Sequence, residues 1–202
     1  VVATKTATEH TYVVDGKRLP SVTELLGVEF PFDVEKVSLS MSDGDAVAAK
    51  ALRDKWTASQ ERGTEVHAEL EAALIGRQEP SGLGVAQLRA NLLARGAVVS
   101  ERVVWTAAYA GTVDLIIARP DGTYEIYDVK TFDSSPHVGT GYAQYKEAKN
   151  ALQLMAYKAA LEAKGLRVRG MYVIPVLRAT KELAVNPSSG KLYATNTEAF
   201  ND

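Results

Sequence analysis

The chain has 202 residues, of which 46 % are hydrophobic and 24 % are charged, and it contains no cysteine. The missing cysteines exclude disulfides, thiolate zinc sites, cysteine-ligated iron–sulfur clusters and a cysteine nucleophile. With a net charge of −2, the molecule as a whole is not electrostatically complementary to nucleic acid. Any site for nucleic acid must therefore be a local groove. No apolar run is long enough to cross a bilayer, and the N-terminus does not resemble a signal peptide. We therefore expect no membrane contact and a cytoplasmic, intracellular protein.

The first half of the chain is predicted to be mainly helical. A short strand over 12–14 enters an Asp-Gly turn, and Ser21 and Glu24 have the spacing of a capping box at the start of a short helix. Longer helices are expected over three ranges, 43–59, 62–76 and 83–95. Gly63 is interpreted as the break between the first two. One face of the second is apolar, through Val66, Leu70, Ala73 and Leu74.

Strand patterns dominate the second half. Residues rich in β-branched side chains predict strands over 98–105, 112–118, 123–131 and 168–177. A loop is expected over 132–142 and a long helix over 143–164. The order predicts a single α/β (α+β) domain over 1–202, with its core at about 12–177 and a loop-rich tail over 178–202. Its mixed sheet would be an antiparallel meander followed by a helical crossover, with flanking helices.

Two acidic residues and a lysine are concentrated on one predicted hairpin. The turn Pro120-Asp121-Gly122 joins its strands. If Arg119 pairs with Thr123, counting along the two antiparallel strands places Asp114 opposite Asp128. A slip of one residue is the alternative, because the length of the loop decides the register. Side chains alternate along a strand, so Lys130 shares a face with Asp128.

Opposed aspartates on an apolar hairpin are destabilising unless a counter-charge is present. Lys130 can offset one negative charge, and a divalent cation such as Mg²⁺ or Mn²⁺ can offset the rest through carboxylate ligands. Such an ion activates water and stabilises charge on a phosphoryl oxygen. A structural ion pair is the alternative. An acid two residues before a lysine is common in this chain, but only Asp128 and Lys130 combine it with an apolar strand that faces another acid.

A wider pattern resembles the PD-(D/E)XK nuclease superfamily, in its RecB-like exonuclease branch. The segments that carry the resemblance lie in the expected order over about 12–177: Leu19–Thr23, Arg62–His67, Gly111–Ile116, Tyr127–Thr131 and Gln153–Tyr157. The first is similar to the opening of phage and mitochondrial exonucleases of this branch. The resemblance implies a restriction-endonuclease-like fold and a metal-dependent DNA exonuclease of phage or bacterial recombination or repair. Its substrate would be DNA with a single-stranded or free end.

The same resemblance implies roles for individual residues. Asp114, Asp128 and the backbone carbonyl of Val129 would bind one or two Mg²⁺ or Mn²⁺ ions, and His67 would be a further ligand or lie close to one. Lys130 would be the catalytic lysine. Gln153 and Tyr157 would orient this lysine or the DNA strand, and they share a helix face at i and i+4.

Each of the other candidate site residues has two possible interpretations. Glu101 is a third metal-binding carboxylate or a solvated glutamate, and Glu71 accepts a hydrogen bond from His67 or lies on the surface. Thr131, Ser134 and Tyr142, in and beside the 132–142 loop, contact single-stranded bases or belong to a plain surface loop. Taken alone, a histidine at position 67 is more typical of a hydrogen-bonded core residue than of a metal ligand, and the Gly63-Thr64-x-x-His67 pattern of the resemblance reverses that interpretation.

Two rival functions stand beside the exonuclease. The first is an endonuclease on the same fold, because end recognition depends on the shape of the channel. The second is a non-catalytic nucleic-acid-binding module, which the intact set of Asp114, Asp128 and Lys130 argues against.

Overall fold

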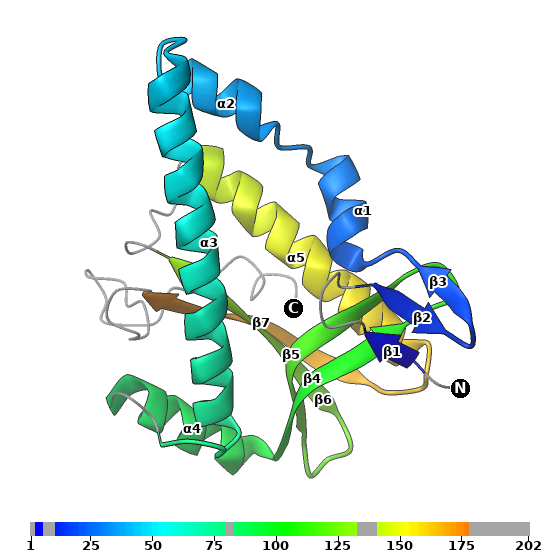
Figure 1. Cartoon of the computed structure of the whole chain (residues 1–202). Coiled ribbons are helices and arrows are strands. Elements are labelled where there is room, and N and C mark those ends of the chain that lie inside the picture. The colour runs from blue at the N-terminus through cyan, green and yellow to red at the C-terminus, as the bar shows by residue number, and fades with distance from the viewer. Residues whose placement is uncertain (1–2, 6–10, 80–82, 133–140, 178–202) are drawn as a thin grey trace.

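The computed structural model describes residues 3–5, 11–79, 83–132 and 141–177, and the structural statements below concern those residues. They form a four-stranded mixed sheet with helices on both faces and a small three-stranded sheet beside it (Figure 1). The small antiparallel sheet consists of β1 (Ala3–Lys5), β2 (Tyr12–Val14) and β3 (Lys17–Leu19). The Asp15-Gly16 turn connects β2 to β3, as the sequence predicts.

The main sheet has the strand order β4-β5-β6-β7. Its strands are β4 (Ala97–Trp105), β5 (Ala110–Ala118), β6 (Tyr124–Phe132) and β7 (Val168–Leu177). Neighbours are antiparallel except β6 and β7, which are parallel and are joined through helix α5 (Gly141–Glu162). The meander and the helical crossover are thus confirmed, and the mixed α/β architecture is that of restriction-endonuclease-like folds.

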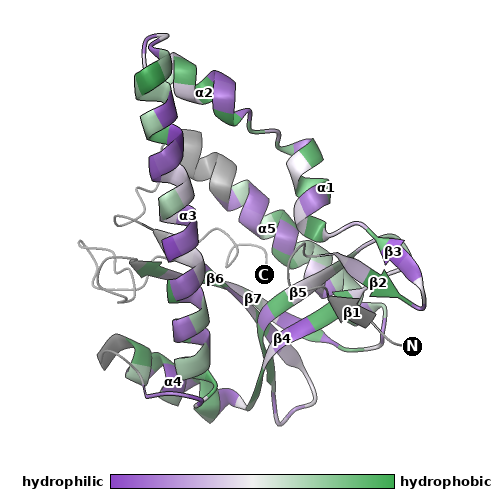
Figure 2. Ribbon diagram, viewed as in Figure 1, coloured by the Kyte–Doolittle hydropathy of each residue, from purple (hydrophilic) through white to green (hydrophobic). Residues whose placement is uncertain are grey.

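Four further helices precede the main sheet in the chain: α1 (Val22–Glu29), α2 (Val34–Met41), α3 (Ala46–Leu74) and α4 (Leu83–Arg95). The capping box at Ser21 and Glu24 is present at the start of α1. Apolar residues of α3 and α4 bury one face of the sheet, and those of α1 and α5 bury the other. The N-terminal half of α3 runs past the sheet with α2 beside it, and many of the α3 residues are hydrophilic (Figure 2).

The predicted helix break at Gly63 is wrong, because α3 is continuous through this residue. Gly63 is buried, and it lies three residues before Val66 and seven before Leu70, on the face that packs toward the sheet. Glycine costs a helix interior about 1 kcal/mol relative to alanine. Burial of the apolar face of α3 outweighs this local preference.

Two further differences concern a helix that was not predicted and the start of another helix. Helix α2 was not expected, although Asp33 caps it by accepting a hydrogen bond from the backbone N–H of Lys36. Helix α5 begins at Gly141, so Tyr142 belongs to a helix and not to the predicted loop. Ser134 and the tail over 178–202 lie outside the described residues.

None of the helices in the described ranges combines the length and the apolar character that a membrane span requires.

Candidate active site

The register of the β5–β6 hairpin places the charged residues next to one another. Arg119 N–H donates to the Thr123 carbonyl at 2.9 Å, which closes the predicted three-residue turn. Ile116 pairs with Ile126 and Leu115 with Tyr127, so the predicted register is confirmed. The pairing ends there, one step before Asp114 and Asp128 would face each other. The two strands diverge at the acidic residues.

A change of face in β5 explains this divergence. Val113 and Ile116 pack in the cluster on the α5 side of the sheet, whereas Leu115 packs in the cluster on the α3 side. Strict alternation would put Val113 and Leu115 on the same face. The strand therefore turns at Asp114. On β4 the corresponding residue is Glu101, between the pairs Ser100–Leu115 and Arg102–Val113. Glu101 has a φ of 48°, an uncommon left-handed conformation for a residue other than glycine.

The turn directs the Asp114 carboxylate toward β6 and α3. Asp114 Oδ2 accepts a hydrogen bond of 2.7 Å from the backbone N–H of Val129. The same oxygen lies 2.9 Å from Nε2 of His67, which α3 presents from the other side. The carboxylate thus takes the place of a strand–strand hydrogen bond. His67 is a direct partner of a site carboxylate and is not a plain core residue.

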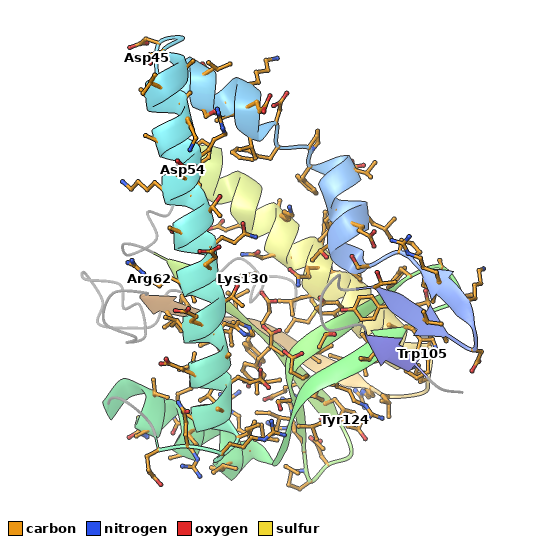
Figure 3. The ribbon with its side chains drawn as sticks, viewed as in Figure 1. Asp45, Asp54, Arg62, Trp105, Tyr124 and Lys130 are labelled. Atoms are coloured by element: carbon orange, nitrogen blue, oxygen red, sulfur yellow. The ribbon has the colours of Figure 1, made fainter. Side chains whose placement is uncertain are left out.

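A second chain of contacts runs from Asp128 to helix α5. Asp128 is 1 % exposed. Lys130 Nζ lies 2.9 Å from Asp128 Oδ1, to which it donates, and 2.7 Å from Oδ2. The lysine also donates to Oε1 of Gln153 at 3.2 Å, and Nε2 of Gln153 donates to the Tyr157 hydroxyl at 2.9 Å. Figure 3 shows Lys130 beside α3. The predicted shared face of Asp128 and Lys130 is confirmed, and Gln153 and Tyr157 hold the amine.

Burial and the neighbouring charges have opposite effects on the pKa values of His67 and Lys130. Burial lowers the pKa of His67, but the hydrogen bond and charge of Asp114 outweigh it, so the net pKa is raised. Burial also lowers the pKa of Lys130, and the charges of Asp128 and Asp114 reverse that shift. The pKa of Asp128 is raised by burial and by Asp114, against the opposing effect of Lys130. The amine is therefore held as a cation between two acids.

Glu71 is a buried member of the same region. It lies four residues after His67 on α3 and is 8 % exposed, so the interpretation as a surface glutamate is wrong. Burial raises the pKa of Glu71, and a hydrogen bond with Ser100 on β4 opposes the shift. Ser100 directly precedes Glu101, whose charge also raises the pKa of Glu71. Glu71 therefore connects α3 to the irregular step of β4.

Gly111 and Ser100 are site neighbours that the sequence argument missed as contacts. A Cβ atom at Gly111 would lie only 2.5 Å from Cε1 of Tyr157, so the tyrosine packs directly on the backbone of β5. Nothing in the local sequence around Ser100 indicates that Glu71 reaches it from 29 residues away. Thr131 lies at the end of β6, half-buried, one residue beyond Lys130.

The family model described as the PD-(D/E)XK nuclease superfamily matches residues 40–199. The chain belongs to the PD-(D/E)XK nuclease superfamily. The match includes every candidate from His67 to Tyr157. Membership of this nuclease superfamily indicates a nucleic-acid substrate and a hydrolase of phosphodiester bonds. No curated protein sequence matches the chain at a significant level.

PD-(D/E)XK nucleases typically use divalent metal ions, and the donor chemistry here fits such an ion. Among the described residues, no group of three or more acidic or histidine side chains is arranged to hold a metal by itself. Mg²⁺, however, is commonly bound by only one or two carboxylates together with water and substrate phosphate. Asp114 and Asp128 supply two. Asp128 Oδ2 is buried and has no hydrogen-bond partner in the described part of the chain, because the nearby amine approaches it at an unsuitable angle.

Proposed function

We propose that the protein is a metal-dependent DNA exonuclease of the RecB-like branch. One observation carries the proposal: Lys130 is held between Asp128 and Gln153 at the point where β5 and β6 diverge, with Asp114 and His67 alongside. A structural ion pair needs only Asp128 and Lys130. The additional carboxylate, histidine and amide are what a phosphodiester hydrolase requires for binding metal, water and phosphate.

Each residue of the chain then has a role. Asp114, Asp128 and the backbone carbonyl of Val129 would hold one or two Mg²⁺ or Mn²⁺ ions, which supply an activated water and stabilise charge on the phosphoryl group. His67 holds Asp114 from α3 and assists as a ligand or a neighbour of one. Glu101 is the further carboxylate candidate, on the irregular step opposite Asp114.

Lys130 stabilises the negative charge that develops on the phosphoryl group during hydrolysis. A lysine ammonium has three N–H donors. Within the described residues Lys130 donates to Asp128 and to Gln153, which leaves a third N–H for a phosphoryl oxygen or for the attacking water. Gln153 is itself fixed by Tyr157, so the amine is positioned before substrate arrives. Preorganised donors of this kind stabilise the transition state more than the ground state.

The choice of exonuclease over endonuclease rests on the Leu19–Thr23 segment, which resembles phage and mitochondrial exonucleases. This segment contacts the site strand, since Ala110 N–H donates to the Pro20 carbonyl at 3.0 Å. We propose that it belongs to the part of the protein that receives a free or single-stranded DNA end. Thr131, Ser134 and Tyr142, which follow Lys130 in the chain, are proposed to contact the strand. A role in phage or bacterial recombination or repair fits such an activity.

The test uses linear DNA labelled at one end and the same sequence as a closed circle, each with Mn²⁺ and with EDTA. The proposal expects mononucleotide or short products from the linear DNA with Mn²⁺ only, and an intact circle. Cleavage of the circle would favour the endonuclease. Binding of both DNAs without any cleavage would favour a non-catalytic module.

A further inference from the structure

An aromatic ring covered by a lysine lies at the end of β4, apart from the candidate active site. Lys164, in the turn after α5, places its Nζ 2.7 Å from the centroid of the Trp105 ring. Both residues line an open hollow of about 410 Å³, together with Asp15 and Thr106. Trp105 packs against the small core around Tyr12. In Figure 3 Trp105 lies by β1, far from α3 and from Lys130.

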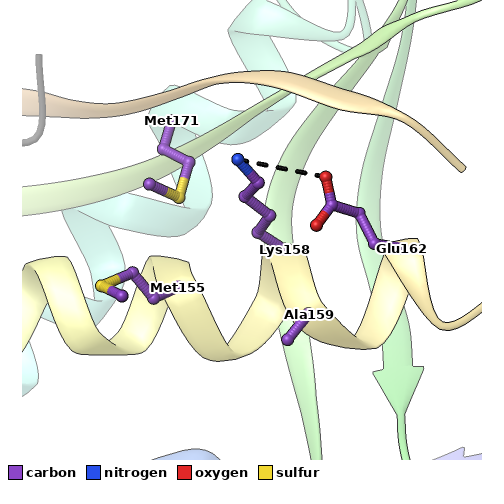
Figure 4. A pocket seen from close by; sticks show the side chains of 5 residues that line it. All are labelled: Met155, Lys158, Ala159, Glu162 and Met171. Atoms are coloured by element: carbon purple, nitrogen blue, oxygen red, sulfur yellow. Dashed lines mark ion pairs between the residues drawn. The ribbon is translucent and has the colours of Figure 1, made fainter. Parts of the chain in front are cut away.

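Two cations lie close together here: Lys164, which lines the hollow with the acidic Asp15, and Arg102, whose charge acts on Lys164. Neither Lys164 nor Arg102 forms an ion pair with a described residue, and burial together with the charge of Arg102 lowers the pKa of Lys164. A second hollow, lined by α5 and by Met171 of β7, contains a lysine with an acidic partner, since Lys158 is paired with Glu162 at 3.9 Å (Figure 4). Two like charges close together are unfavourable for folding. An anion between Lys164 and Arg102 would relieve the repulsion.

Arg102 also connects the hollow to the candidate active site. It pairs with Val113, the neighbour of Asp114, while Trp105 pairs with Ala110. Asp114 and Ala110 are four residues apart, or about 13 Å along a strand. Along β4, Arg102 therefore lies between Glu101, the residue across from Asp114, and Trp105. A nucleic-acid strand that is bound at Asp114 needs only a few nucleotides to reach the hollow.

We propose that Trp105, Lys164 and Arg102 form a second binding site for single-stranded nucleic acid, a few nucleotides from the cleavage site. A base stacks on the Trp105 ring when Lys164 moves off it, and Lys164 and Arg102 then bind the adjacent phosphates. Aromatic stacking next to basic side chains is the general way in which proteins bind single strands without reading their sequence. The inference rests on the proposed function, because the strand held here is the substrate of the site at Asp114.

Tryptophan fluorescence tests the site directly, because the chain has two tryptophans. A Trp56→Phe protein keeps Trp105 as the only reporter. In EDTA, where no hydrolysis occurs, oligothymidylate should quench this emission in a saturable way. Trp105→Leu, measured by anisotropy of labelled oligonucleotide, should weaken binding about fivefold or more, the lower end expected for one stacked base. Arg102→Met and Lys164→Met should each lower the slope of log affinity against log salt by about 0.7, the value for one phosphate contact on a single strand.

Lys158→Met is the matched control, since this lysine is on α5 and already has an acidic partner. It should leave affinity and salt slope unchanged. The proposal is overturned if oligonucleotide binds without changing Trp105 emission, or if Lys164→Met and Arg102→Met behave like the control. It is also overturned if thymidine monophosphate quenches as strongly as the oligonucleotide, which would indicate a pocket for free nucleotides. If oligothymidylate quenches Trp105 emission but DNA is not cleaved in Mn²⁺, only the proposed nuclease activity is refuted. If DNA is cleaved but Trp105 emission is not quenched, only the proposed second binding site is refuted.

Discussion

Replacing Asp128 by asparagine separates two opposing charge effects at the candidate site. Two facing aspartates alone would predict a neutral or stabilising change, because the substitution removes repulsion. The structure gives Asp128 a partner, however, and buries it to 1 % exposure. Without the carboxylate, Lys130 keeps its charge with no acid at 2.7 Å.

The expected loss of stability in Asp128→Asn follows from the burial of the ion pair. Breaking a buried ion pair costs roughly 3–5 kcal/mol. The Lys130 side chain is 29 % exposed, so solvent reduces this cost, and the loss of repulsion with Asp114 returns a few tenths to about 1 kcal/mol. We therefore expect Asp128→Asn to lower the free energy of unfolding by about 1–3 kcal/mol in metal-free buffer. For a chain of this size that is a fall in Tm of about 2–12 °C.

Thermal and urea melts in EDTA measure the change, and Asp54→Asn is the matched control. Asp54 pairs with Lys50 at 2.6 Å on the exposed side of α3, where both side chains are more than half exposed. Its substitution should change stability by about 0.5 kcal/mol or less. Mn²⁺ should raise the Tm of the parent protein and not that of Asp128→Asn, since a ligand of the folded state stabilises by mass action. An Asp128→Asn protein as stable as its parent in EDTA would show that repulsion dominates and that the ion pair does not hold Lys130.

Three other substitutions test the remaining contacts. Lys130→Ala should lower kcat on the order of 10²-fold or more while DNA affinity persists, and near-normal kcat would make the lysine a structural counter-charge only. His67→Ala should reduce activity in a way that raised Mn²⁺ partly restores; a loss of Tm with no dependence on metal would instead mark a packing role. Gly111→Ala should destabilise by about 1–3 kcal/mol, because its Cβ would meet the Tyr157 ring. Adding Tyr157→Leu should recover part of that stability, and no recovery in urea melts would place the strain elsewhere.

Local patterns were sufficient for the hairpin and for the residues that it presents. The Asp121-Gly122 turn fixes where β5 meets β6, and once Arg119 pairs with Thr123 the pairs as far as Leu115–Tyr127 follow by counting. The alternation of side chains then puts Lys130 beside Asp128. The i, i+4 spacing predicted that Gln153 and Tyr157 share a face, and they are hydrogen-bonded. These contacts depend on neighbours along one strand or one helix, which the sequence records directly.

Contacts between distant elements were beyond the same reasoning. The change of face at Asp114 requires a matching irregularity at Glu101, and neither residue has a glycine or proline beside it that would predict one. The burial of Glu71 depends on a serine of β4. The local preference of glycine disfavours a helix at Gly63, but packing places this residue in the interior of helix α3. Helix α2 is a different case, because the Asp33 cap and the apolar residues that follow it are local signals from which the helix could have been predicted.

The irregular step at Asp114 is the reason that the site differs from an ordinary sheet. A regular β5 would place Asp114 opposite Asp128, where like charges repel and both carboxylates compete for Lys130. By turning there, the strand gives Asp114 its own donors, the Val129 N–H and the His67 ring. Lys130 is left to Asp128 and Gln153. The uncommon backbone conformation of Glu101 accompanies an arrangement in which two neighbouring carboxylates have separate partners. Two neighbouring carboxylates with separate partners are suited to bind a divalent cation together with water and substrate phosphate.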